Sequence, residues 1–201
     1  NDTFTITVAN TNDAPTAIAL SATVIDENAA GAVVGTLSTT DVDAGDSHTY
    51  ALSGTDAASF EVVNGELKLK GSADYETKNS YSVTVTATDA AGAVFAQSFA
   101  ITVTDINETP TAIALSATAI DENAAGVVIG DLTTSDVDAG DTHTYTLSGT
   151  DADSFEVVNG QLKLKDSVTA DYETQSSYSV TVTATDSGSL TTTQDFTVNV
   201  N

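Results

Sequence analysis

The chain has 201 residues, 40% of them hydrophobic, and 29 acidic residues face only five lysines, so the formal net charge is −24. This charge excludes nucleic acid and anionic membrane surfaces as partners, because binding to phosphates needs clustered Lys and Arg. The hydrophobic fraction is sufficient for packed cores, and without cysteine the domains must be stabilised by core packing or metal instead of disulfides. No run approaches the roughly 18 apolar residues of a membrane helix, so direct membrane insertion is not expected.

Two long segments of the chain are nearly the same. Pro15 and Pro110 open equivalent stretches, an offset of 110 − 15 = 95 residues, and Phe4-Thr5-Ile6-Thr7-Val8 matches Phe99–Val103 by the same offset. A repeat of this length indicates tandem domains. We therefore expect one domain over 11–106, another over 107–201, and the last strand of a preceding repeat over 1–10. The chain is then an excerpt from a longer array.

Within each copy the pattern is that of β-strands. Tyr81–Thr88 and Phe99–Val103 alternate apolar and polar residues, which is the period of a half-buried strand. Asn64-Gly65 separates two apolar-patterned runs, the strongest short signal for a hairpin. Short strands with regular turns and no helical pattern predict an all-β fold, two tandem seven-stranded Greek-key sandwiches of the immunoglobulin type. The strands expected in the first copy lie near residues 16–24, 32–39, 48–53, 59–63, 66–70, 81–88 and 94–104.

Acidic motifs recur between these strands in the same order in both copies. In the first copy they are Asp26-Glu27-Asn28, Asp41-x-Asp43-x-Gly45-Asp46, Asp74-Tyr75-Glu76, Asp89 at the end of Ala87-Thr88-Asp89, and the linker Asp105-Ile106-Asn107-Glu108-Thr109-Pro110. Together they resemble the calcium-binding elements of cadherin repeats. The resemblance covers both copies and implies that the fold is a cadherin-like sandwich. It also implies that each calcium site takes the Glu, the Asp-x-Glu and the linker from one repeat, and the Asp-x-Asp and Ala-x-Asp from the next.

The chain departs from the family pattern in two places. The family's linker commonly has Asp-x-Asn-Asp-Asn, whereas Glu108 and Thr109 replace the last two residues here. The Gly-Asp extension after Asp-x-Asp and the Ala/Thr-rich strands look like the bacterial cadherin-like branch. That branch is found in large secreted adhesins and in surface proteins that handle polysaccharide, so the resemblance implies an extracellular or bacterial cell-surface location.

Mapping the motifs gives one complete junction with eight carboxylates, or about −8, which two or three calcium ions would largely offset. Calcium takes six to eight oxygen ligands, carboxylates and carbonyls among them. The junction residues are Glu27, Asp74, Glu76, Asp105, Asn107, Glu108, Asp136, Asp138 and Asp186. The same mapping leaves two partial sites, expected to bind calcium weakly or not at all; they comprise Asn12, Asp13, Asp41, Asp43 and Asp89 at one end, and Glu122, Asp171 and Glu173 at the other.

Other kinds of site are disfavoured. An EF-hand is rejected because the twelfth position from Asp41 is Leu52, which cannot close the loop as a bidentate ligand. His48 and its counterpart His143 are interpreted as surface strand residues, since no second His or Cys is near. Asp74 with Glu76 could form a hydrolase acid pair, but no cleft is indicated and no Gly-x-Ser-x-Gly nucleophile motif occurs, so we expect no enzyme.

The function we infer at this stage is a calcium-binding repeat pair of a secreted surface protein. Calcium at the linker would rigidify an extended stalk that supports cell adhesion. Two alternatives remain open: a calcium-dependent carbohydrate-binding module of a polysaccharide-degrading system, and homophilic adhesion between copies of the repeat. Tyr75 and its counterpart Tyr172 are expected to pack under their loops and not to stack on sugar.

Overall fold

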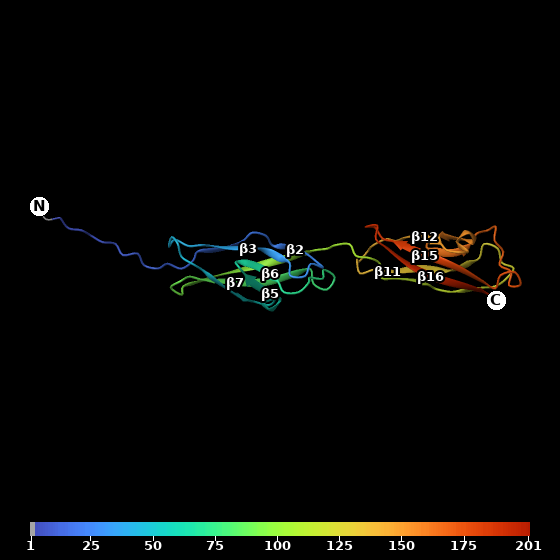
Figure 1. The fold of residues 1–201 in the computed structure, drawn as a ribbon, viewed down its shortest axis with the longest axis horizontal. Helices are drawn as coiled ribbons and strands as arrows, with labels where there is room; N and C mark the ends of the chain where they lie inside the picture. Colours follow the sequence, from blue (N-terminus) through green and yellow to red (C-terminus); the bar gives the residue numbers. More distant parts are fainter. Residues whose placement is uncertain (1–2) are drawn as a thin grey trace. The chain divides into compact units, whose positions relative to one another are not determined.

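The computed structural model describes residues 3–201 and consists of strands joined by loops, with two short 3-10 turns (Figure 1). The chain divides into a first unit that ends at Ile106 and a second unit, Asn107–Asn201. The first unit contains β1 (Ala17–Leu20), β2 (Val24–Asp26), β3 (Val33–Thr40), β4 (Thr49–Ser53), η1 (Ala57–Ser59), β5 (Phe60–Val63), β6 (Glu66–Leu69), β7 (Ser80–Thr88) and β8 (Val94–Thr104). The second unit contains β9 (Ala112–Leu115), β10 (Ala119–Ile120), β11 (Val128–Ser135), β12 (Thr144–Ser148), η2 (Ala152–Ser154), β13 (Phe155–Val158), β14 (Gln161–Leu164), β15 (Ser177–Thr185) and β16 (Thr191–Val200).

Each unit is a sandwich of two four-stranded sheets. In the first unit the strand orders are β1-β3-β6-β5 and β2-β8-β7-β4, and in the second they are β9-β11-β14-β13 and β10-β16-β15-β12. All pairings are antiparallel except β2 with β8 and β10 with β16. The predicted all-β tandem sandwich is confirmed.

The first strand expected in each copy is in fact two strands that belong to different sheets. β1 pairs with β3, and after Ser21 the chain crosses over so that β2 pairs in parallel with β8. Gly35 makes the crossing possible, because a Cβ there would lie 2.7 Å from Ser21 Oγ and 2.8 Å from Ala22 N. Gly130 occupies the equivalent place in the second unit, where a Cβ would lie 2.6 Å from Ser116 Oγ. The single continuous strand predicted for 16–24 was therefore wrong in its continuity.

The hairpin predicted at Asn64-Gly65 is confirmed. β5 and β6 pair in antiparallel register from Val63 opposite Glu66. Asn64 has φ 53° and Gly65 has φ 78°, so both central residues adopt the left-handed conformation that a type I′ turn requires. The same turn recurs at Asn159-Gly160.

The core lies between the sheets of each unit and follows the alternation of the long strands. In β7, Val83, Val85 and Ala87 are fully buried, while the residues between them face outward. Phe60 packs edge-on against Tyr81, with ring centroids 5.5 Å apart. Burying each large apolar side chain contributes roughly 1.5–3 kcal/mol. Each unit therefore has a core of its own.

Residues 3–14 form no strand and are exposed, whereas the later counterparts of residues 3–9 lie in β8. Phe4, Ile6 and Val8 are 91%, 88% and 88% exposed, whereas the equivalent Ile101 and Val103 of β8 are buried. The apolar side chains of this alternating segment are therefore in contact with solvent. Asn1 and Asp2, the remaining residues of the strand expected over 1–10, lie outside the described part of the chain.

Candidate metal centres at the domain ends

The sheet topology collects the acidic motifs at the two ends of each sandwich. β8 begins at Val94 and ends at Thr104, so Asp89 and Asp105 lie at opposite ends of it. β2 runs parallel to β8, which brings Glu27 to the end where Asp105 lies. β7 runs antiparallel, and Ser80 at its start pairs with Thr102, so the loop that carries Asp74 also reaches that end. Each unit therefore has an N-terminal acidic cluster and a C-terminal acidic cluster.

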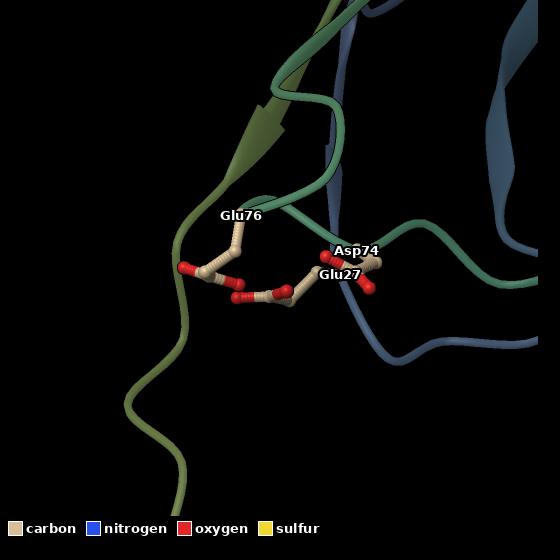
Figure 2. Close-up of side chains that lie close together, drawn as sticks. All are labelled: Glu27, Asp74 and Glu76. Atoms are coloured by element: carbon tan, nitrogen blue, oxygen red, sulfur yellow. The ribbon is translucent and has the colours of Figure 1, made fainter. Parts of the chain in front are cut away.

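The C-terminal cluster of the first unit consists of Glu27, Asp74 and Glu76. Figure 2 shows the three carboxylates close together, with Glu27 following β2 and the other two on the loop before β7. One oxygen from each of the three lies within 4.8 Å of the others. The sequence predicted these three residues as neighbours, and the structure brings them together.

Glu27 is the anchor of this cluster. It is only 3% exposed, and its carboxylate accepts hydrogen bonds from two backbone N–H groups. Tyr75 N donates to Oε2 and Ile106 N donates to Oε1, each at 2.8 Å. Glu27 thereby ties the Asp74–Glu76 loop to the start of the linker and places Asp105, the residue before Ile106, at the same end of the domain.

The N-terminal cluster of the second unit is formed by Asp136, Asp141 and Asp186, which offer oxygens within 4.8 Å of one another. Asp186 is 6% exposed, and Asn107 Nδ2 donates to its Oδ2 at 3.0 Å. Burial opposes the charged form of Asp186, but the hydrogen bonds from Asn107 and Leu190 outweigh it, so its pKa lies below the ordinary value. Asp186 is therefore ionised at neutral pH.

Two linker residues contact this cluster and the neighbouring Asp138. Besides the bond from Asn107 to Asp186, Glu108 N donates to Asp138 Oδ2 at 2.8 Å. Gly188 leaves room for Asn107, since a Cβ at that glycine would lie 2.4 Å from the amide carbon of Asn107. The peptide bond from Ile106 to Asn107 thus joins a residue held by the first unit to one held by the second.

The first unit repeats this arrangement at its own N-terminal end. Asp41, Asp46 and Asp89 form the cluster, and Asn12 Nδ2 donates to Asp89 Oδ2 at 2.9 Å. That hydrogen bond holds the pKa of Asp89 below its ordinary value, and backbone N–H groups of the following turn act in the same direction. Two further predicted residues meet nearby, since Asp13 N donates to Asp43 Oδ2 at 2.7 Å. All five residues of this partial site are therefore close neighbours.

The C-terminal cluster of the second unit, Glu122 with Asp171 and Glu173, is more open. Its oxygens also lie within 4.8 Å of one another, but the bond from Tyr172 N to Glu122 Oε2 is 3.4 Å, against 2.8 Å for its counterpart at Glu27. Tyr172 is 52% exposed, so the expectation that it packs under its loop was wrong, whereas Tyr75 does pack against the core.

Sequence reasoning missed two pairs of residues at the N-terminal clusters. Asp46 and Asp141, the Gly-Asp extensions, were left out of the ligand set, although their spacing from Asp41 and Asp136 was visible. His48 and His143 were interpreted as surface strand residues, which is wrong for both. They lie in the loops before β4 and β12, with side chains 11% exposed.

Each histidine holds the first Asp of its cluster. His48 Nε2 lies 3.0 Å from Asp41 Oδ2, and His143 Nε2 lies 2.9 Å from Asp136 Oδ2. The backbone N–H of Asp43, together with His48, lowers the pKa of Asp41. An ionised carboxylate only accepts hydrogen bonds, so Nε2 carries the proton and donates it.

The donor set fits a hard cation. Every candidate ligand offers oxygen, and calcium is bound in proteins by carboxylates and carbonyls. Asp46 Oδ2 and Asp141 Oδ2 are buried within the described structure and have no hydrogen-bond partner. A buried carboxylate oxygen without a donor is costly, and a cation would supply the missing interaction. The N-terminal clusters therefore have both the charge and the unsatisfied oxygens that a calcium ion requires.

Two consecutive β-sandwiches with carboxylate clusters at their ends place the chain in the class of tandem β-sandwich repeats with candidate metal sites at the domain ends. The cadherin domain model matches residues 21–104 and 116–201. The chain belongs to the cadherin family. Cadherin domains are extracellular, bind calcium in general and are not enzymes.

The chain is similar to human protocadherins. Protocadherin alpha-2 of Homo sapiens is 32% identical over 182 residues, covering 82% of this chain and 19% of the relative. Protocadherin Fat 1 of Homo sapiens is 31% identical over 200 residues, covering 91% of this chain and 4% of the relative. The chain thus spans only a small part of these relatives, and their eukaryotic source does not support the bacterial branch indicated by the sequence.

Solved protocadherins share the fold. The structure titled "PcdhgB3 EC1-4 in 50 mM HEPES" has a TM-score of 0.74 at 26% identity, covering 96% of this chain and 51% of that one. The structure titled "Protocadherin gammaB7 EC3-6 cis-dimer structure" has a TM-score of 0.67 at 26% identity, covering 94% of this chain and 48% of that one. The described part of this chain contains no helix long and apolar enough to cross a membrane.

Proposed function

We propose that this chain is a calcium-stiffened repeat pair of an extracellular adhesion protein. The observation that carries the proposal is the division of the linker between the units: Glu27 accepts from Ile106 N, and Asp186 accepts from the side chain of the next residue, Asn107. Acidic ligands from both units are therefore tethered by one peptide bond. Calcium bound to both sets would fix the hinge.

The residues that would hold calcium at this junction are those expected from the sequence. They are Glu27, Asp74, Glu76, Asp105, Asn107, Glu108, Asp136, Asp138 and Asp186. Without a cation their negative charges repel one another. Extracellular calcium sites are commonly weak, with Kd of about 10⁻⁴ to 10⁻³ M, and a dense set of carboxylates favours the tighter end.

Small-angle scattering of the 201-residue chain, with calcium and then with chelator, tests the mechanism. We expect a narrower distribution of end-to-end distances with calcium. Asp105→Ala or Glu108→Ala should abolish the difference while leaving both sandwiches folded by circular dichroism. Equal distributions in calcium and in chelator would refute a calcium-stiffened hinge. Loss of folding in the variants would instead assign the metal a role inside the domains.

We propose that the exposed segment Phe4–Val8 is the last strand of a preceding repeat in a longer array. Its match to Phe99–Val103 and the exposure of Phe4, Ile6 and Val8 support this. Adding the upstream repeat should pair residues 4–8 in a sheet and bury these three side chains. Slower hydrogen exchange of the backbone amides of residues 4–8 would report this. Unchanged exchange in the longer chain would contradict the proposal.

Homophilic adhesion is the second candidate function. The observation that favours it is the similarity to the protocadherin gammaB7 structure, whose title names a cis-dimer. Analytical ultracentrifugation of the chain from 10 µM to about 1 mM, with calcium, would show self-association; a strict monomer throughout would refute it for this repeat pair.

Two finer inferences depend on the sequence resemblance alone. A bacterial surface protein as the source is supported by the Gly-Asp extensions and the Ala/Thr-rich strands. Carbohydrate binding follows only from that branch. A polysaccharide pull-down with and without calcium tests it, and no retention in either condition would remove it.

A further inference from the structure

Asp46 and Asp141 carry an interaction that the fold leaves incomplete. Their Oδ2 atoms are buried and accept no hydrogen bond, although each residue lies in a tight turn at the domain surface. Both follow a glycine in the left-handed conformation, Gly45 at φ 95° and Gly140 at φ 96°. The turn is closed by a backbone hydrogen bond from Asp46 N to Asp43 O, and from Asp141 N to Asp138 O, each at 3.3 Å.

Both aspartates lie close to other carboxylates. One oxygen of Asp141 lies within 4.8 Å of oxygens from Asp136 and Asp186, and Asp46 has the same relation to Asp41 and Asp89. The first aspartate of each motif, Asp41 or Asp136, has a side chain only 5% exposed and accepts a hydrogen bond from a histidine. Three carboxylates at this spacing repel one another strongly when partly removed from water.

Asp141 is held in this unfavourable place by a specific contact. Ser187 Oγ donates to Asp141 Oδ1 at 2.7 Å, whereas Oδ2 has no hydrogen-bond partner. The equivalent of Ser187 in the first unit is Ala90, which has no hydroxyl, so Asp46 lacks this support. The two clusters are thus the same site with and without a positioning hydroxyl.

We propose that Asp46 and Asp141 are additional calcium ligands, each completing a three-carboxylate site made by one domain alone. The inference rests on the proposed function and extends it. The cluster Asp41, Asp46 and Asp89 should then bind calcium in this chain without an upstream repeat. This differs from the expectation that a partial site binds weakly or not at all.

Calcium titration calorimetry of the full 201-residue chain tests the assignment. Asp46→Asn and Asp141→Asn should each weaken one binding event at least tenfold or remove it. The exposed acids Glu61 and Asp153 provide matched controls, since Glu61→Gln and Asp153→Asn remove a charge outside every cluster and should leave binding unchanged.

The reciprocal exchange at the positioning hydroxyl provides a second test. Ser187→Ala should weaken the site of the second unit, and Ala90→Ser should tighten that of the first, each by about tenfold, the loss or gain of one hydrogen bond to a carboxylate.

Thermal melts separate a ligand from a structural residue. In chelator, Asp141→Asn should melt at or above the wild-type temperature, because a repelling charge is gone. In saturating calcium it should melt below wild type. A lower melting temperature in both conditions would make Asp141 a structural residue and overturn the proposal.

The outcomes also distinguish the two proposals. If the wild-type chain binds no calcium, the proposed function fails. If it binds calcium and both Asn variants bind with unchanged stoichiometry and affinity, only the additional ligands are refuted.

Discussion

At the scale of single residues, each N-terminal cluster contains an aspartate whose carboxylate is held by a histidine. Asp136 contributes an oxygen to the candidate cation cluster, and His143 Nε2 donates to its Oδ2 at 2.9 Å. A ligand that is already held by a hydrogen bond loses less conformational freedom when metal binds. Removing such a partner commonly lowers metal affinity by about tenfold or more. The histidine is therefore a positioning residue for the candidate site.

Exchanging His143 tests this positioning role. His143→Ala should weaken calcium binding at the second cluster by roughly tenfold, whereas His143→Gln, whose amide N–H can reach Asp136, should recover most of the affinity. Calorimetry at pH 8 measures both. If Gln and Ala weaken binding equally, the hydrogen bond to Asp136 does not support the site.

Ser189 is strained in a way that its counterpart is not. It has φ 73°, while the equivalent residue of the first unit is Gly92 at φ 95°. The left-handed conformation costs a non-glycine residue roughly 1–2 kcal/mol, and the entropy of glycine in the unfolded chain offsets about half of that.

Ser189→Gly should therefore stabilise the second unit by about 0.5–1 kcal/mol, and Gly92→Ser should destabilise the first by a similar amount. Urea unfolding in chelator measures both. Opposite signs are required, and a destabilising Ser189→Gly would show that the hydroxyl makes a contact worth more than the strain.

At the scale of elements, an aspartate in each unit completes the edge of a long strand. β4 pairs with β7 only as far back as Ser53 opposite Thr84, so Ser82 N has no strand partner on that side. Asp56 Oδ2 accepts from Ser82 N at 2.7 Å, and Lys78 Nζ donates to Oδ1. In the second unit Asp151 does the same for Ser179, with Gln175 in place of the lysine.

The stabilisation by Asp56 should depend on pH in a defined direction. The hydrogen bond from Lys78, followed by that from Ser82, lowers its pKa from 3.8. A carboxyl with a lowered folded-state pKa stabilises the fold fully above its unfolded pKa, and the contribution is lost as the pH falls through the folded value.

Asp56→Asn should therefore lower the melting temperature at pH 7, and the gap to wild type should close progressively below about pH 4. Melts in chelator from pH 7 to pH 2 measure this, with Asp153→Asn as the control for removing an exposed acid. A gap that persists at pH 2 would mean that the amide fails for steric reasons and that charge is not the cause.

The sequence predicted those elements that depend on neighbours in the chain. Asn64-Gly65 specifies its own turn, and the alternation around Val83 specifies a strand face. The break between β1 and β2 could not be predicted, because it depends on Gly35 passing under Ser21, fourteen residues earlier. Likewise, the acidic loops were predictable from spacing, but Asp46 meets Asp89 only because strands far apart in sequence end together. The contact of His48 with Asp41 depends on the conformation of the loop between β3 and β4.

At the scale of the whole molecule, electrostatic repulsion between acidic residues opposes the stabilisation that core packing provides. The chain carries −24 with only five lysines, and several acids are crowded into clusters at the domain ends. Self-repulsion of this size destabilises compact states, and salt screens it over a Debye length of about 8 Å at physiological ionic strength. Bound calcium would act on the same repulsion, but at specific positions.

Salt and calcium should therefore substitute for each other in part. In chelator, raising NaCl from 20 mM to 500 mM should raise the melting temperature by several degrees, because screening relieves the repulsion. In 5 mM calcium the same change of salt should have a smaller effect, since the strongest repulsions are already neutralised where they arise. Scanning calorimetry over the four conditions measures the difference. If salt stabilises the chain equally with and without calcium, the repulsion that limits its stability lies outside the end clusters, and calcium acts on the hinge alone.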